Sequence, residues 1–251
     1  EAFEEMVAAK SGAQYAVAVS SGTAALHLGL LSLDLFSNER VVTSPLTFVA
    51  TPAAIIHAGL VPKFADILPD SLLLDPREAL KTDTDVIVPV DYAGDLAETR
   101  GFVSTPVIID AAHSFGFRKH PLTGVHGTCF SFHPVKTIAC GEGGAFVTNI
   151  KSVADKVRSL RDHGRVSGIS YDIGFNYRLS DIHAALGLSQ SKKLEKFLSR
   201  RREITKYYFA QLQTTSHVQL PLDKDHAWHI FVIRVAASKR DAFRAFLLER
   251  G

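Results

Sequence analysis

The chain has 251 residues, of which 46% are hydrophobic and 22% are charged, so it is long enough to bury one large α/β core or one core and part of another. The formal net charge of +2 favours neither nucleic-acid binding nor a membrane surface, and no apolar run approaches the ~20 residues of a membrane span. Because Cys129 and Cys140 lie outside any C-x-x-C pair and no signal segment is recognisable, we expect free thiols and a cytoplasmic protein.

Short apolar strands alternate with helices along most of the chain. In chain order the pattern predicts a helix over 1–10, a strand over 15–19, a helix over 24–33, a strand over 41–43, a helix over 47–59, strands over 61–65, 85–90, 107–110, 127–132 and 144–148, and a helix over 152–163. This alternation indicates an α/β fold with a mostly parallel sheet that helices cover on both faces.

The C-terminal part has a different pattern. A long helix over 180–212, with Ser180 as a possible cap, precedes a strand that starts in 227–235 and a helix over 239–250. We therefore predict a large domain over 1–205 and the beginning of a smaller α+β domain over 206–251. The chain begins inside a predicted helix and ends just after another, so we expect a longer natural protein.

The first candidate site is the turn at 20–23, Ser-Ser-Gly-Thr, which joins a strand to a helix. The amides of a first helical turn have no partner within the helix, and the helix dipole favours an anion there. Thr23 can add a hydroxyl donor. Small polar residues also cap many helices, so on its own the turn is equally well explained as a cap.

The second candidate is Asp110, the last residue of the predicted strand over 107–110, with His113 close behind. An acid at the carboxyl end of a buried strand lies where open α/β sheets bind ligands. Asp110 could pair with the protonated pyridine nitrogen of pyridoxal 5′-phosphate (PLP), and His113 could reach the phenolic oxygen of the ring. The alternatives are a strand-end cap for Asp110 and a satisfied, half-buried histidine, and for His113 alone the second alternative is favoured.

The third candidate is Lys136, which follows an apolar strand and precedes the glycine-rich turn at 141–144. A lysine in this setting suits a Schiff base with PLP, and Ser131 could bind phosphate. A lone lysine is usually a solvated surface residue. Here an anion turn, a strand-end acid and a lysine after a further strand occur in the order that a PLP enzyme of the aspartate-aminotransferase fold (PLP fold type I) requires.

The amino-acid sequences of these segments resemble those of the DegT-type sugar-nucleotide aminotransferases. The similar segments are 21–28, 45–51, 109–113, 131–136, 141–144 and 174–181, and the resemblance stays in register over residues 1–251. Three segments, 89–94, 131–136 and 161–164, are similar to one branch, the UDP-4-amino-4,6-dideoxy-N-acetyl-altrosamine transaminases of pseudaminic-acid biosynthesis.

The resemblance implies a role for each matching residue. It implies that Lys136 is the Schiff-base lysine and proton carrier, that Asp110 faces the pyridine nitrogen and that His113 approaches the ring oxygen. It also implies phosphate binding by Gly22, Thr23, Ala24 and Ser131, contact of Phe48 with the cofactor ring, and contributions of Asn176 and Arg178 from the partner chain of a homodimer. Without the resemblance, Phe48 would be a core residue, Asn176 a loop residue and Arg178 a surface charge.

The implied function is PLP-dependent transfer of an amino group from an amino acid, such as glutamate, to the C4 keto group of a UDP-linked keto-deoxy-sugar for glycan biosynthesis, with pyridoxamine phosphate (PMP) as the intermediate form. One alternative is a PLP- or PMP-dependent keto-sugar dehydratase, although those relatives tend to carry histidine where Lys136 stands. Another is a non-catalytic binding protein of this fold. The connection at 95–105 and the segment 115–127 are shorter than is usual in the family.

Other chemistries lack their motifs. Four histidines, His113, His120, His126 and His133, occur without an H-E-x-x-H pattern, so no metal site is predicted. The chain has no G-x-G-x-x-G fingerprint, no Walker-A lysine and no G-x-S-x-G elbow.

Overall fold

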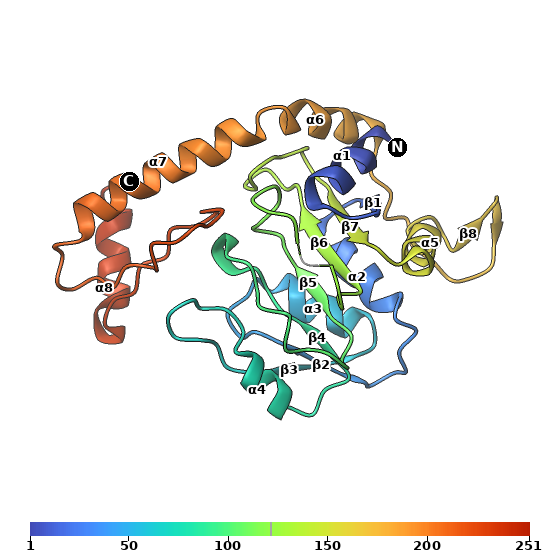
Figure 1. Cartoon of the computed structure of the whole chain (residues 1–251), viewed down its shortest axis with the longest axis horizontal. Helices are drawn as coiled ribbons and strands as arrows, with labels where there is room; N and C mark the ends of the chain where they lie inside the picture. Colours follow the sequence, from blue (N-terminus) through green and yellow to red (C-terminus); the bar gives the residue numbers. More distant parts are fainter. Residues whose placement is uncertain (121) are drawn as a thin grey trace.

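The computed structural model describes residues 1–120 and 122–251, and its centre is a twisted sheet (Figure 1). The strands are β1 (Tyr15–Val19), β2 (Arg40–Thr43), β3 (Val61–Phe64), β4 (Val86–Val88), β5 (Ile108–Asp110), β6 (Gly127–Ser131) and β7 (Gly144–Thr148). They form two ladders, β3-β2-β4 and β5-β6-β7-β1. Parallel bridges from Ile87 to Val107 and from Val90 to Asp110 join β4 to β5, so the two ladders form one continuous sheet.

The sheet is mostly parallel, as the sequence predicts, and β7 is the exception. It runs antiparallel to both of its neighbours, β6 and β1. As a result Gly144, its first residue, pairs with Val19 at the end of β1 and with Ser131 at the end of β6. The start of β7 and the ends of its neighbours therefore meet at one edge of the sheet.

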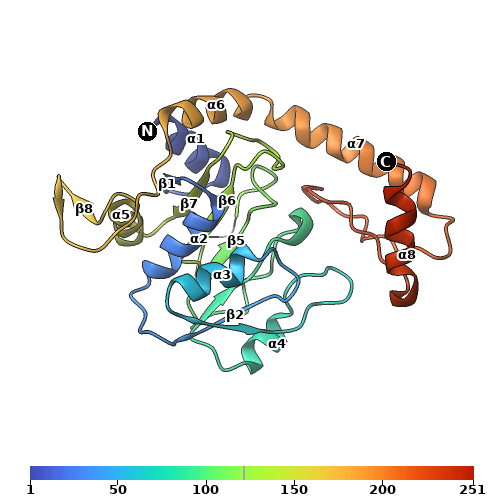
Figure 2. The same ribbon diagram turned by 180° about the vertical axis from the view of Figure 1, so that it is seen from behind.

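Helices cover one face of this sheet almost completely. The helices α2 (Gly22–Leu31), α3 (Ala50–His57) and α5 (Lys151–Leu160) bury apolar residues in a cluster with β1, β2 and β4. Figure 2 shows α2 and α3 in front of the strands. The run of small and aliphatic residues in α2 suits a helix that is buried on nearly all sides.

The opposite face has a mixed cover. The helices α1 (Ala2–Ser11), α4 (Pro76–Lys81), α6 (Asp181–Ser191) and the first half of α7 (Leu194–Leu212) pack there. Between β4 and β5, and between β5 and β6, the described residues form only a short 3₁₀ turn, η1 (Tyr92–Gly94). Phe102, Phe115 and Val125 from these connections enter the core in place of a helix.

The predicted helix over 180–212 is wrong in one respect, because it is two helices. Ser180 caps α6 by accepting a hydrogen bond from the His183 amide, but the chain turns at Lys192 and Lys193 before α7 begins. The turn places Leu194 against Gly116, where an added Cβ would lie 2.3 Å from Leu194 Cδ2. Tertiary packing, rather than helix propensity, decides the break.

Two other expectations change at this stage. The helix predicted over 47–59 covers only Ala50–His57, and no strand forms over 227–235, where Trp228 has a φ of 51°. The last helix, α8 (Ala237–Leu248), buries none of its residues. The domain boundary predicted at 205 lies inside α7 and stays a prediction.

The remaining element is an exposed hairpin of β8 (Arg165–Val166) and β9 (Ile169–Ser170). Among the described residues, no helix combines the length and the apolar character that a membrane crossing requires.

Candidate active site

A cavity of about 550 Å³ opens at the carboxyl ends of the parallel strands. It brings together most of the predicted site residues, namely Gly22, Thr23, Phe48, Asp110, His113, Ser131 and Lys136. Phe48 lies at its open side, with its side chain 72% exposed. These residues come from four separate segments of the chain, so only the fold makes them neighbours.

One end of the cavity is lined by the first turn of α2 and by Ser131. Ser21 caps α2, since its hydroxyl accepts a hydrogen bond from the Ala24 amide at 3.0 Å. A Cβ on Gly22 would lie 2.8 Å from Ser131 Cβ, so glycine is needed for α2 to begin this close to β6. The first-turn amides and the buried Ser131 hydroxyl fit the phosphate of PLP. Phosphate binding by Gly22, Thr23, Ala24 and Ser131 stays a prediction, and the Ala24 amide already donates to Ser21.

Asp110 lies in the interior of the cavity and is only 5% exposed. The Thr51 hydroxyl donates to Oδ2 at 2.7 Å and the Ala112 amide donates to Oδ1 at 3.2 Å. Burial raises the pKa of this carboxyl, while the Thr51 hydrogen bond, the Ala112 amide and the positive charge of Lys136 oppose the rise. A carboxylate that is oriented but poorly solvated suits a cationic partner such as a protonated pyridine ring.

Thr51 is a site residue that the sequence analysis missed. Its hydroxyl lies 2.7 Å from that of Thr47 as well as 2.7 Å from Asp110 Oδ2. The two threonines are four residues apart in the Thr-Phe-Val-Ala-Thr segment, a spacing that places both on one side of a helical turn. That spacing is the only signal that could have revealed them.

Lys136 is half-buried beside this carboxylate. Its backbone amide donates to the His133 carbonyl at 2.8 Å, which closes the turn that follows β6. Burial lowers the pKa of the Lys136 amine, and the charge of Asp110 partly restores it. A lowered pKa increases the fraction of neutral amine, the form that attacks a carbonyl and accepts a proton.

His113 is not alone in the cavity. Its ring stacks on His229, with centroids 4.3 Å apart and an interplanar angle of 28°. Burial first, and then the charge of Lys136, lower the pKa of His113 to about 3 and that of His229 to about 4. His229 lies in the segment that the sequence analysis expected to be a strand, so no pattern assigned it to the site.

Asn176 and Arg178 do not enter this cavity. Asn176 is exposed and forms an antiparallel bridge with Asp162. The Arg178 guanidinium donates to Asp162 Oδ1 at 2.6 Å. Both lie on the outer surface of the chain, and their predicted contact with a partner's cofactor stays a prediction.

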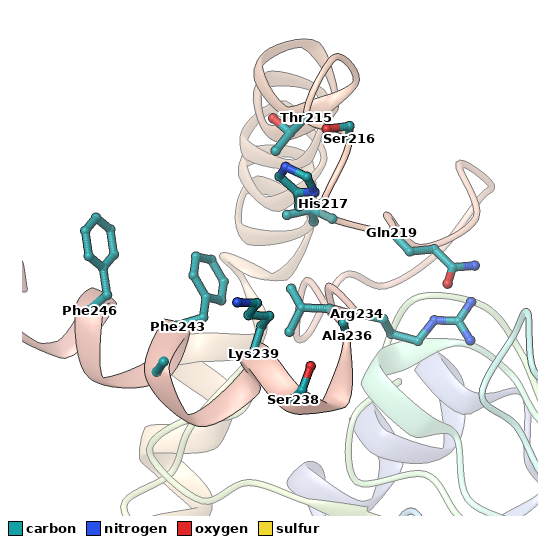
Figure 3. Close-up of a pocket in the computed structure, with 13 residues that line it drawn as sticks. Thr215, Ser216, His217, Gln219, Arg234, Ala236, Ser238, Lys239, Phe243 and Phe246 are labelled. Atoms are coloured by element: carbon teal, nitrogen blue, oxygen red, sulfur yellow. The ribbon is translucent and has the colours of Figure 1, made fainter.

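A second, larger cavity of about 1290 Å³ lies between the 215–219 segment and α8 (Figure 3). It presents Arg234 and Lys239 with Phe243 and Phe246, and no carboxylate lines it among the described residues. His217 and Lys239 are exposed. We assign the chemistry to the smaller cavity, because it holds the buried and mutually interacting acid, lysine and histidines.

Comparison with known proteins agrees with this assignment. A sequence profile of the DegT/DnrJ/EryC1/StrS aminotransferase family matches residues 1–251. DesV of S. venezuelae, solved in complex with a ketimine intermediate, is 28% identical to this chain with a TM-score of 0.92. The similarity covers 99% of this chain and 71% of DesV. PseC of Helicobacter pylori, an aminotransferase involved in the biosynthesis of pseudoaminic acid, is 28% identical with a TM-score of 0.90, over 100% of this chain and 74% of its own.

NtdA of Bacillus subtilis was solved with bound PMP. It is 29% identical with a TM-score of 0.90, and the similarity covers 97% of this chain and 60% of that protein. These likenesses confirm the PLP fold type I that the sequence predicts, and they agree with PLP and PMP as the cofactor forms that fit the cavity.

Proposed function

Because the chain belongs to the DegT/DnrJ/EryC1/StrS aminotransferase family, we propose that it moves an amino group from glutamate to the C4 keto group of a UDP-linked keto-deoxy-sugar. The observation that carries the proposal is the cavity in which Lys136, Asp110 and the first turn of α2 meet. Those three groups provide a nucleophilic amine, a counter-charge for the pyridine nitrogen and an anion site. PLP, when bound, supplies an electron sink for the negative charge that forms at the donor Cα.

Each residue of the cavity has a separate role in the proposed reaction. The Lys136 amine removes the proton from the donor Cα. In the second half of the reaction, the same group delivers a proton to the sugar carbon that receives the amino group. The Asp110 carboxylate keeps the pyridine nitrogen protonated, and the α2 amides with Ser131 hold the phosphate. Phe48 covers the open side of the cavity. Lys136 also disfavours the dehydratase alternative, which is associated with histidine at this position.

Two sets of observations support the choice of sugar. The segments 89–94, 131–136 and 161–164 resemble the pseudaminic-acid branch, and the likeness to PseC extends over the whole chain. The proposal places the reaction in the cytoplasm, in keeping with the free, buried Cys129 and Cys140, and in a biosynthetic route to glycan sugars.

The test is a direct assay of both halves of the transfer. The protein with PLP is incubated with glutamate and a UDP-linked 4-keto-6-deoxy-sugar, and 2-oxoglutarate and the amino sugar are measured by mass spectrometry. A 3-keto isomer and a dTDP-linked 4-keto-sugar serve as comparison acceptors. We expect amination of the UDP 4-keto-sugar. Formation of a deoxy-ketone, or no keto acid from any amino acid, would contradict the proposal.

We further propose that the enzyme works as a homodimer in which Asn176 and Arg178 complete the neighbour's site. Their position outside their own cavity supports this arrangement. Two inactive variants, Lys136→Ala and Arg178→Ala, are mixed and allowed to exchange subunits. The mixture is expected to regain part of the activity, because each hybrid contains one intact site. An active monomer by light scattering, or a mixture that stays inactive, would refute the shared site.

A further inference from the structure

The segment 224–230 reaches from the C-terminal part of the chain to the turn at Tyr92–Gly94 (Figure 1). The amides of His229 and Ile230 donate to the Ala93 carbonyl at 2.9 and 3.2 Å, and the amide of Ala227 donates to the Gly94 carbonyl at 3.1 Å. These bonds are what bring His229 into the cavity.

The backbone at this contact has little freedom to move. Gly94 has a φ of 103°, and a Cβ there would lie 2.8 Å from Ala227 Cβ and 3.0 Å from the His113 carbonyl oxygen. Ala93 and Trp228 also have positive φ, at 58° and 51°. Non-glycine residues rarely adopt this conformation, so the surrounding contacts must hold it in place.

Arg201 on α7 supplies such a contact. Its Nη1 donates to the carbonyl oxygens of Trp228 and His229, both at 3.0 Å. Charge-assisted hydrogen bonds of this kind are stronger than neutral ones. Its neighbour Arg200 instead bonds the exposed Glu203 at 2.8 Å, away from the cavity.

The ring of His113 depends on this arrangement. In the described part of the chain its imidazole makes no hydrogen bond, and its buried Nδ1 has no partner. The stacked His229 ring, 4.3 Å away, is the aromatic contact of the His113 ring among the described residues. Buried Nδ1 of His229 likewise lacks a partner among these residues.

We infer that Arg201 is a positioning residue: it fixes the backbone of Trp228 and His229, so that His229 stacks on His113 and holds the His113 ring in the orientation used in the reaction. This inference rests on the proposed function for the role of His113. The contacts themselves do not depend on it, so the two can be tested apart.

The first test uses the protein without cofactor and measures the titration of the His113 and His229 imidazole rings. Histidine-labelled protein is titrated by NMR, with His113 and His229 assigned from Asn variants. Lys136 faces both rings, Arg201 faces the His229 ring, and the two rings stack on each other. In Arg201→Met we expect the pKa of His113 to rise from about 3 towards its ordinary value as the ring becomes solvated, with no change in Arg200→Met.

Arg201→Lys guards against a folding defect, because it keeps the charge and one donor. It should give a smaller shift than Arg201→Met, and thermal unfolding should show all three variants folded. Unchanged His113 and His229 titrations in Arg201→Met would overturn the inference.

The second test is turnover of the loaded enzyme. Misplacement of a reacting group by a remote substitution costs on the order of a hundredfold in rate, so we expect roughly a tenfold to hundredfold lower kcat in Arg201→Met, partial recovery in Arg201→Lys and wild-type kcat in Arg200→Met. A shifted titration with unchanged kcat would overturn the functional part of the inference. If wild-type protein aminates no sugar, the proposed function fails while the NMR result stands.

Discussion

The two cavities differ in what surrounds their charged groups. The larger one, about 1290 Å³ beside α8, presents Arg234 and Lys239 from a surface where no residue of the helix is buried. The smaller one, about 550 Å³, encloses a carboxylate that is 5% exposed and a half-buried lysine whose pKa burial lowers. Volume is therefore a poor guide here. The burial of an acid, a lysine and two histidines together in one cavity therefore identifies the site.

The sharpest test of this contrast replaces one lysine in each cavity. We expect Lys136→Ala to lower the release of keto acid on the order of a thousandfold or more, because no other described amine lines the smaller cavity. Lys239→Ala should keep wild-type turnover. Borohydride reduction followed by peptide mass spectrometry should place the cofactor on Lys136 alone. Substantial turnover by Lys136→Ala, or a large loss in Lys239→Ala, would reverse the assignment.

Asp110→Asn keeps the size of the side chain and removes its charge. Thr51 can still donate to the amide oxygen, so we expect the fold to survive and kcat to fall on the order of a hundredfold. Steady-state kinetics with saturating PLP, alongside circular dichroism, measures both effects. A variant with full activity would show that Asp110 is only a strand-end cap.

Gly22→Ala tests the anion end of the cavity. The added methyl group would lie 2.8 Å from Ser131 Cβ, which costs about 1–3 kcal/mol in strain or displacement. If the strain falls on the bound state, the dissociation constant for PLP should increase roughly tenfold, as measured by fluorescence titration. Gly101→Ala is the matched control, since its Cβ would lie 3.8 Å from Pro76 Cβ. Equal affinities in both variants would argue against a close approach at Gly22.

The last effect concerns the pH dependence of stability. Burial lowers the pKa of His113 to about 3 and the pKa of both His226 and His229 to about 4. An unfolded histidine binds a proton near 6.5, so below that pH the unfolded state binds more protons and the free energy of unfolding falls, by about 1 kcal/mol per histidine for each pH unit. The urea midpoint should therefore decrease from pH 7 to pH 5.

Substitutions separate the buried histidines from an exposed one. His226→Asn should make the decrease in the urea midpoint shallower, whereas His217→Asn, an exposed residue of the larger cavity, should leave it unchanged. A midpoint that does not depend on pH would contradict the burial of these rings.

Sequence patterns predicted the parts of the site that local structure determines. Asp110 ends an apolar strand, Lys136 follows one and the 20–23 turn precedes a helix, so periodicity and turn chemistry predicted where these residues lie, while their roles stay predictions. His229 could not be predicted, because it enters the cavity through a left-handed Trp228 and backbone bonds to Ala93. The break between α6 and α7 could not be predicted for a similar reason. Lys192 and Lys193 are good helix formers, and the turn there depends on the contact of Leu194 with Gly116, which is distant in sequence.

The antiparallel β7 also governs the order in which the protein can be completed during synthesis. β1 is hydrogen-bonded only to β7 among the described strands. Tyr15–Val19 therefore cannot form its ladder until the ribosome has synthesised the chain as far as Thr148. At the usual 5–20 residues per second, that wait is on the order of ten seconds. During it an apolar strand has no ladder partner, and an unpaired strand of this kind favours aggregation of a growing chain.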